Sequence, residues 1–300
     1  MSNEIFFDRQ YRLKAGVQGE VGFEIGEPTS PHNDALHISF SVEKTDSQTL
    51  NTSKISIWNL NDQHIQTLMR DMCTVELCAG YGNSTPCIFR GTVTNVQTAL
   101  DGSDRATDIE LVDGFGQLTD TYVSLSYKGF VNTYVLIEAV ADKMGTPVLY
   151  SPSAKSVAQK RVLASGYSYV GAAKTALANI TLVAGLSWSI QNGTLHIQKR
   201  GEAVTQAVQV ISPSTGLIGV PKRIYNSAVT AGTESGSTLQ DSLFGYEIVY
   251  FMNGNIGVND KIYLESKIVT GLFRVYKLQI DGDNLSGDWQ CTAQVLEVNG

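Results

Sequence analysis

The sequence predicts a mainly β protein in which two related β-units flank a small α+β segment. Three observations lead to this prediction. Val, Thr, Ser, Ile and Tyr are plentiful, as is typical of strands, and 28 glycines interrupt the chain. Two segments near the ends, 75–114 and 262–300, carry a similar succession of strands and turns. Two helical patterns and a hairpin fall together in the middle, within 127–200.

The two similar segments each contain an apolar strand, a Phe-Arg strand, an Asp-Gly turn and an alternating strand that closes on glycine. The match is approximate, because the loop lengths differ. A duplicated β-unit presents two similar surfaces, which suits the building of a ring better than catalysis. The corresponding pieces are Val75–Leu77 and Ile262–Leu264, Phe89-Arg90 and Phe273-Arg274, Asp101-Gly102 and Asp281-Gly282, and Ile109–Gly114 and Val295–Gly300.

The first unit, 1–122, is predicted to be an antiparallel barrel or sandwich with one helix. Apolar and polar residues alternate over 36–42, as in a half-buried strand, and the pattern continues in 54–59. Asn61 or Asp62 can cap a short helix whose apolar face holds Ile65, Leu68 and Met69. Further strands are expected near 73–79, 87–97 and 107–112.

The middle segment, 123–202, is predicted to be α+β. Thr133 can cap one helix, which runs through Met144 and is stopped by Gly145, and a second helix spans Ser168–Ala184. A hairpin follows over 186–198. Its tip is Asn192-Gly193, a pair that tolerates the positive φ angles of a type I′ turn.

The last unit, 203–300, is β again. A small and polar stretch, 231–242, predicts a mobile loop. The candidate strands are Val208–Val210, Ile224–Val229, Tyr246–Met252, Ile262–Leu264, Phe273–Ile280 and Trp289–Val298.

Charge and composition disfavour several classes of protein. The net charge is −7 with no basic run, which disfavours tight nucleic-acid binding but is compatible with a conduit that DNA passes without sticking. We find neither an apolar leader nor a stretch of about 18 apolar residues, so we expect cytoplasmic synthesis and no stable membrane binding. The four cysteines have no zinc-site spacing and are expected to be free thiols.

No residues form a recognisable catalytic, cofactor or metal site. The four histidines, His32, His37, His64 and His196, lack a partner at a familiar catalytic spacing and are expected to be exposed. The acidic stretch 281–288 favours a polar turn over a calcium loop, because Leu285 stands where a ligand is needed. We therefore expect no enzyme activity. Trp188 and Trp289 are expected in the core, whereas Trp58 suits a core or an interface equally.

Three local patterns resemble the central hub proteins of contractile phage-tail and tailocin baseplates. They occur in the expected order and span about residues 55–290. The first is Ile57-Trp58-Asn59-Leu60, which leads through the predicted helix to 75–82 and 88–93. The second is 186–193, followed by 212–221. The third is 282–289.

The resemblance implies a homotrimer in which each subunit supplies two tube-like β-barrels, so that six barrels match a sixfold tail tube. Such a hub would be a structural virion protein, assembled in the host cytoplasm. It would join the tail tube protein to a central spike, continue the DNA channel, and contact the tape-measure protein and other baseplate proteins. Because no spike-like repeat follows before Gly300, we expect the spike to be a separate protein.

Two other functions fit parts of the sequence. A carbohydrate-binding or adhesin module would need an exposed aromatic row, which Trp58, Tyr81, Tyr122 and Tyr127 could supply. A wall-degrading enzyme is disfavoured because no catalytic constellation is present. A glycan array and a zymogram test these alternatives.

We expect 231–242 and the first strand, Phe6–Leu13, to become ordered against ring neighbours. Deletion of 231–242 should therefore weaken assembly with the tube and leave the fold intact. Counting assembled particles by electron microscopy checks this, and normal assembly would contradict it.

Overall fold

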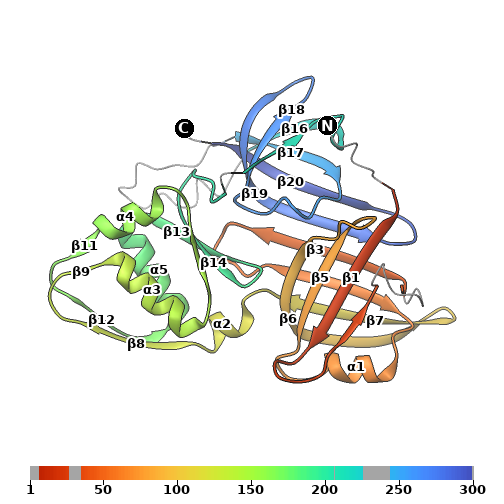
Figure 1. Ribbon diagram of the computed structural model, residues 1–300, viewed down its shortest axis with the longest axis horizontal. Coiled ribbons are helices and arrows are strands. Elements are labelled where there is room, and N and C mark those ends of the chain that lie inside the picture. The colour runs from red at the N-terminus through yellow and green to blue at the C-terminus, as the bar shows by residue number, and fades with distance from the viewer. Residues whose placement is uncertain (1–6, 27–34, 206, 226–243, 299–300) are drawn as a thin grey trace.

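The computed structural model describes residues 7–26, 35–205, 207–225 and 244–298. The predicted mainly β class is confirmed: thirteen strands form one large sheet, and a smaller α+β layer lies to one side of it (Figure 1). The strands of both predicted β-units belong to this single sheet. No closed barrel forms within the described ranges.

The first repeat is a run of antiparallel strands in the order β3-β4-β7-β6-β5-β1-β2. Helix α1 (Asp62–Leu68) connects β4 to β5 and is capped by Asn61, whose Oδ1 accepts from the His64 amide at 2.8 Å. The strand bounds are β1 (Arg9–Gly16), β2 (Phe23–Ile25), β3 (Ile38–Thr45), β4 (Thr52–Trp58), β5 (Thr74–Tyr81), β6 (Cys87–Asp101) and β7 (Asp104–Val112).

The second repeat has the corresponding order, β16-β17-β20-β19-β18-β15. The predicted duplication is thus confirmed in the strand order. The sixth strands differ, because β1 is antiparallel to β5 whereas β15 is parallel to β18. Strand β2, which lies beyond β1, has no counterpart among the described strands of the second repeat. The bounds are β15 (Val208–Ile211), β16 (Leu217–Tyr225), β17 (Phe244–Phe251), β18 (Lys261–Glu265), β19 (Thr270–Asp283) and β20 (Trp289–Glu297).

The sequence match between the repeats does not hold residue by residue. Leu77 of β5 lies opposite Phe89, whereas the matching Leu264 of β18 lies opposite Gly271. The two Phe-Arg pairs are therefore displaced by two positions in the strand register. Arg90 is exposed, whereas Arg274 is buried against Asp46 and Asn259.

One hydrophobic core serves both repeats. Alternate side chains of β3 and β19 face it, among them Phe40, Val42, Leu278 and Ile280, all less than 5% exposed. Trp289 packs edge-on against Phe40 with ring centroids 5.4 Å apart. The expected core position of Trp289 is confirmed.

The smaller layer has a core of its own, built around α3 and α5, which lie side by side in Figure 1. Trp188 belongs to it, as expected, at 1% exposure. The bounds are α2 (Phe115–Thr119), β8 (Tyr122–Tyr127), β9 (Val131–Asn132), α3 (Thr133–Met144), β10 (Val148–Tyr150), α4 (Ala154–Lys160), β11 (Val162–Leu163), β12 (Tyr167–Ala172), α5 (Ala173–Ala184), β13 (Leu186–Gln191) and β14 (Thr194–Lys199).

Three local predictions are corrected here. The helix predicted from Ser168 begins at Ala173, because 167–172 pairs along its whole length with β8 as strand β12. The cap of α3 is Asn132, whose Oδ1 accepts from the Val135 amide at 2.9 Å, and Thr133 is the first helical residue. Met69 does not join the buried face of α1 and is 59% exposed.

The β13–β14 hairpin docks its tip onto the large sheet. Asn192 and Gly193 have φ angles of 51° and 77°, as a type I′ turn requires, which confirms the predicted turn. Their amides donate to the buried Asp113 carboxylate at 2.5 and 2.8 Å. Lys44 of β3 donates to Asn192 Oδ1 at 2.8 Å, so polar groups fix the hairpin between two strands of the sheet.

Several predictions fall on residues outside the described ranges. They are the loop 231–242, His32, the first residue of the strand Phe6–Leu13, and the end of the strand Ile224–Val229 beyond Tyr225. Among the described helices, none is long and apolar enough to cross a bilayer.

Burial lowers the pKa of His196, on β14, to about 4, and Lys44 adds to the effect. The ring Nδ1 is buried with no hydrogen-bond partner among the described residues. In the unfolded chain the ring protonates near its usual value of about 6.5, so the free energy of unfolding should fall as the pH drops from about 6.5 to 4.

His196→Gln should remove about 2 kcal/mol of this acid sensitivity, because the variant has no imidazole to protonate. Urea unfolding at pH 7.5 and 4.5 measures the difference. If the free energy of unfolding falls by the same amount between these two pH values in the variant and in the unchanged protein, His196 is not the source of the acid sensitivity.

Candidate functional site

No group of three or more His, Cys, Asp or Glu side chains in the described ranges is arranged to hold a metal ion. The four cysteines are free thiols, as predicted, and Cys78 lies opposite Cys87 between β5 and β6. Polar contacts between residues 240 or more positions apart lie instead where the two repeats meet. We take this junction between β3 and β19 as the candidate site.

β3 and β19 join the repeats by direct antiparallel pairing. The register runs from Lys277 opposite Thr45 to Asp283 opposite Ser39. β19 is long enough to pair with β18 through its first half and with β3 through its second half, while β20 covers its other edge. The pairing therefore makes one continuous sheet from two repeats.

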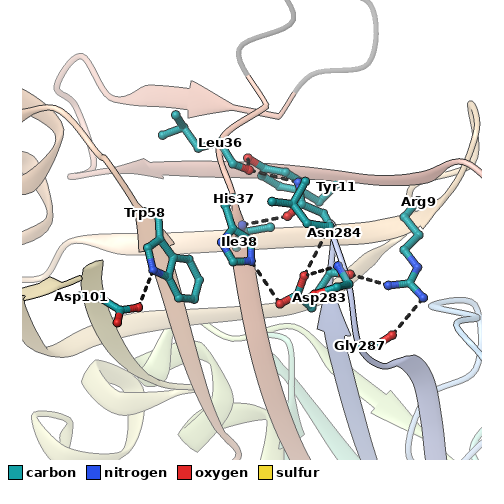
Figure 2. A network of polar contacts seen from close by, with 12 residues as sticks. Arg9, Tyr11, Leu36, His37, Ile38, Trp58, Asp101, Asp283, Asn284 and Gly287 are labelled. Carbon is teal, nitrogen blue, oxygen red and sulfur yellow. Dashed lines mark hydrogen bonds and ion pairs between the residues drawn. The ribbon is translucent and has the colours of Figure 1, made fainter. Parts of the chain in front are cut away.

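The acidic turn after β19 binds the segment that enters β3. Asn284 accepts from the Ile38 amide at 2.9 Å and donates to the Leu36 carbonyl at 3.1 Å. His37 Nε2 lies 3.1 Å from Asp283 Oδ2 (Figure 2). Of the stretch predicted as a turn, 281–283 is the end of β19 and only 284–288 connects β19 to β20. Asp283 and Asn284 together fix the start of β3 by polar contacts.

Strand β1 reaches the same turn from the other side. Figure 2 shows Arg9 donating to the backbone carbonyls of Asp283 and Gly287, at 2.7 and 3.0 Å. The Tyr11 hydroxyl donates to the Leu36 carbonyl at 2.8 Å. One turn is therefore held by residues from the start of the chain and from β3.

The electrostatics of Asp283 suit this role. Burial acts to raise its pKa, but hydrogen bonds from the Ser286 amide, His37 and the Leu285 amide outweigh burial, and the pKa is lowered. The carboxylate is accordingly ionised at neutral pH. It accepts hydrogen bonds from the Leu285 and Ser286 amides within its own turn, and it pairs with His37 across the junction.

The histidine predictions need correction. The three described histidines are only partly exposed. His37 has an acidic partner 246 residues away, which spacing along the sequence could not indicate. His64 stacks on Phe23 with ring centroids 4.0 Å apart, and His196 is largely enclosed between the hairpin and the sheet.

Trp58 extends the site toward the β6–β7 turn. Its ring stacks on His37 with centroids 3.9 Å apart, and its Nε1 donates to Asp101 at 3.0 Å (Figure 2). The side chain is partly exposed. It therefore lies on the surface beside the junction and outside the core.

A buried ion pair closes the other end of the junction. Arg274 of β19 is 1% exposed and pairs with Asp46, which follows β3. Arg274 also donates to Asn259 Oδ1 at 2.8 Å, and Gln198 of β14 reaches Asp46 at 3.4 Å. Both repeats and the smaller layer thus meet at one charged pair. In the sequence, this buried pair is indicated by Arg274 itself, a charged residue within the apolar run around Phe273.

The four aromatics considered for a carbohydrate site are not brought into one row. Trp58 and Tyr81 belong to the large sheet, whereas Tyr122 and Tyr127 lie on β8 in the smaller layer. A pocket of about 590 Å³ between residues 80–86 and 252–255 contains Tyr81 alone of the four.

Arg274→Met should lower the free energy of unfolding by about 3 kcal/mol, because it removes one partner of a buried ion pair. Arg90→Met, at the arginine that matches Arg274 in sequence but is exposed, should change it by less than about 0.5 kcal/mol. Chemical unfolding of both variants checks this. Equal effects would show that the buried pair has no special role.

Comparison with known proteins supports one kind of fold. No protein-family model and no curated protein matches the sequence. Among solved structures, a tail protein from Neisseria meningitidis MC58 matches with a TM-score of 0.62 and 12% identity, covering 96% of this chain and 97% of that one. The 43 kDa tail protein of prophage MuSo2 from Shewanella oneidensis matches with a TM-score of 0.61 and 8% identity, covering 96% and 98%.

A third structure is the c3393 protein of E. coli. It is described as a component of the type VI secretion system with structural similarity to the T4 bacteriophage tail proteins gp27 and gp5. Its TM-score is 0.55 at 7% identity, over 88% of this chain and 74% of that one. At such identities the likeness concerns the fold, and it extends over nearly the whole chain. The chain shares its fold with these tail proteins, as the sequence resemblance predicted.

Proposed function

We propose that this chain is a structural virion protein, the trimeric hub of a tail baseplate. The observation that carries the proposal is the repeated strand order, β3-β4-β7-β6-β5-β1 and β16-β17-β20-β19-β18-β15, within one chain of tail-protein fold. Two repeats in each of three subunits make six similar units. A threefold hub built in this way can contact a sixfold tail tube with equivalent surfaces.

Three domains follow from this proposal: a tube-like barrel unit over 1–122, an α+β domain over 123–202, and a second tube-like unit over 203–300. The separate core of the smaller layer, drawn from residues 118–197, supports the middle domain. Over the residues that the structure describes, the two repeats form an open sheet. Closure into barrels or a ring would require strand edges from neighbouring subunits.

The proposed partners follow from the position of a hub. The tail tube protein would continue the lumen, a separate spike protein would close its far end, and the tape-measure protein and other baseplate proteins would contact the hub. DNA would only pass through. The net charge of −7 supports passage, because an acidic wall repels phosphates.

The two alternative functions have weaker support. A carbohydrate-binding or adhesin module would need its aromatics on one surface, and the four candidates are divided between the two layers. A wall-degrading enzyme would need a nucleophile or an acid–base pair in a pocket. The pocket beside Tyr81 has Asp8 as the one carboxylate among its lining residues. A larger pocket of about 840 Å³ is lined by Asp113 and Asp120, but Asp113 is buried and bound to the amides of the hairpin tip.

The proposed trimer makes a direct prediction. The native mass of the purified chain, measured by light scattering across a concentration series, should approach three times 32.5 kDa. A persistent monomer that binds glycans on an array would favour the adhesin reading instead. A zymogram of the same sample, expected to be blank, serves as the control for wall-degrading activity.

A further inference from the structure

The two repeats of the chain meet in one completed strand pairing, which is the finished example of their contact. Each of the two strands in this pairing has an equivalent in the other repeat, and the corresponding edge of that equivalent has no partner among the described strands. The finished example is the pairing of 277–283 in β19 with β3. The strand that corresponds to β19 is β6, whose residues 95–101 pair only with β7 in the described chain. The strand that corresponds to β3 is β16, which among the described strands pairs only with β17.

We propose that residues 95–101 of β6 in one subunit pair in antiparallel fashion with β16 of a second copy of this chain. This inference rests on the ring proposed above and specifies its intersubunit contact. The contact would be head to tail, because two different edges meet, and such contacts generate rings when the rotation closes.

A bulge in each long strand fixes the correspondence between β6 and β19. The ladder to the neighbouring strand skips one residue after Val93 in β6 and after Val275 in β19. A bulge bends a strand and so turns its remaining length away from its first neighbour. Counted from the bulge, Thr98 in β6 takes the position of Ile280 in β19.

The ladders through the neighbouring strands fix the other side. Ile280 lies opposite Val42 of β3 across the finished junction. In the second repeat, Arg223 of β16 takes the position of Val42. In the first repeat, Leu111 lies opposite Val93 at the bulge, Ser53 lies opposite Leu111, and Val42 lies opposite Ser53. In the second repeat, Val295 lies opposite Val275 at the bulge, Tyr246 lies opposite Val295, and Arg223 lies opposite Tyr246. Thr98 is therefore expected opposite Arg223.

Exposure of apolar side chains supports a missing neighbour at both edges. Leu100 of β6 is 81% exposed, and in β16 Val220 is 65% and Tyr225 is 54% exposed. At the finished junction, Leu278 and Val42 are fully buried. Strand edges that expose apolar residues are ordinarily covered in an assembly.

The charges of the two edges are complementary. The β6–β7 turn carries Asp101 and Asp104, and β16 carries Lys222 and Arg223. All four side chains are exposed, and Lys222 also lies 3.8 Å from Glu247 of β17, which leaves Arg223 as the cation of this edge without a carboxylate partner among the described residues. Arg105, beside the acidic turn, is directed to Asp62 at 2.7 Å. An antiparallel pairing with Thr98 opposite Arg223 brings the acidic turn toward the Lys222 end of the contact.

Disulfide cross-linking tests the register. In the double variant Thr98→Cys/Arg223→Cys, mild oxidation of the full-length protein should give a ladder that ends at three chains on a non-reducing gel. The matched control is Lys54→Cys/Arg223→Cys. Lys54 is exposed, but its strand, β4, is paired on both edges, so this variant should give no ladder. The unchanged protein controls for its four native thiols.

The outcomes separate this inference from the trimer itself. A trimeric native mass without a ladder above the control would overturn the edge pairing and leave the trimer standing. A ladder that continues beyond three chains would support the pairing and overturn the trimer. A monomer that gives no ladder would overturn both.

Discussion

The pairing of β3 with β19 is the contact on which the rest of the structure depends. Without it, each repeat is an open sheet with an unsatisfied backbone edge and a core open on one side. With it, Val42, Phe40, Leu278 and Ile280 close a single core across both repeats. The position of the smaller layer follows, because its hairpin docks beside the same strand at Lys44.

Polar groups at the two ends of this pairing determine its register. Asp283 and Asn284 hold the start of β3, and Asp46 with Arg274 holds its end. Because a slip of one residue would turn the core side chains outward and separate these partners, apolar alternation and polar contacts favour the same register. Buried ion pairs contribute little net stability, so the role of Arg274 is better understood as fixing one alignment.

Local patterns in the sequence predicted most of the strands, the hairpin at Asn192-Gly193 and the duplication, since these depend on alternation and turn residues. They failed where tertiary pairing overrides helical periodicity, as at 167–172, which β8 holds as a strand. The junction could not be predicted, because its partners are some 240 residues apart, as Ser41 and Asp281 are. The apparent match of Arg90 with Arg274 also misled, since the register displaces them by two positions.

The distance along the chain between β3 and β19 has a consequence for biosynthesis. During translation, β3 emerges early and must wait for nearly the whole chain before its outer partner leaves the ribosome. Pairing over such a long separation is slow to form, because loop closure precedes any gain from contacts. A nascent chain therefore has no complete sheet to offer a neighbour, and quaternary assembly is postponed until synthesis of the second repeat is complete.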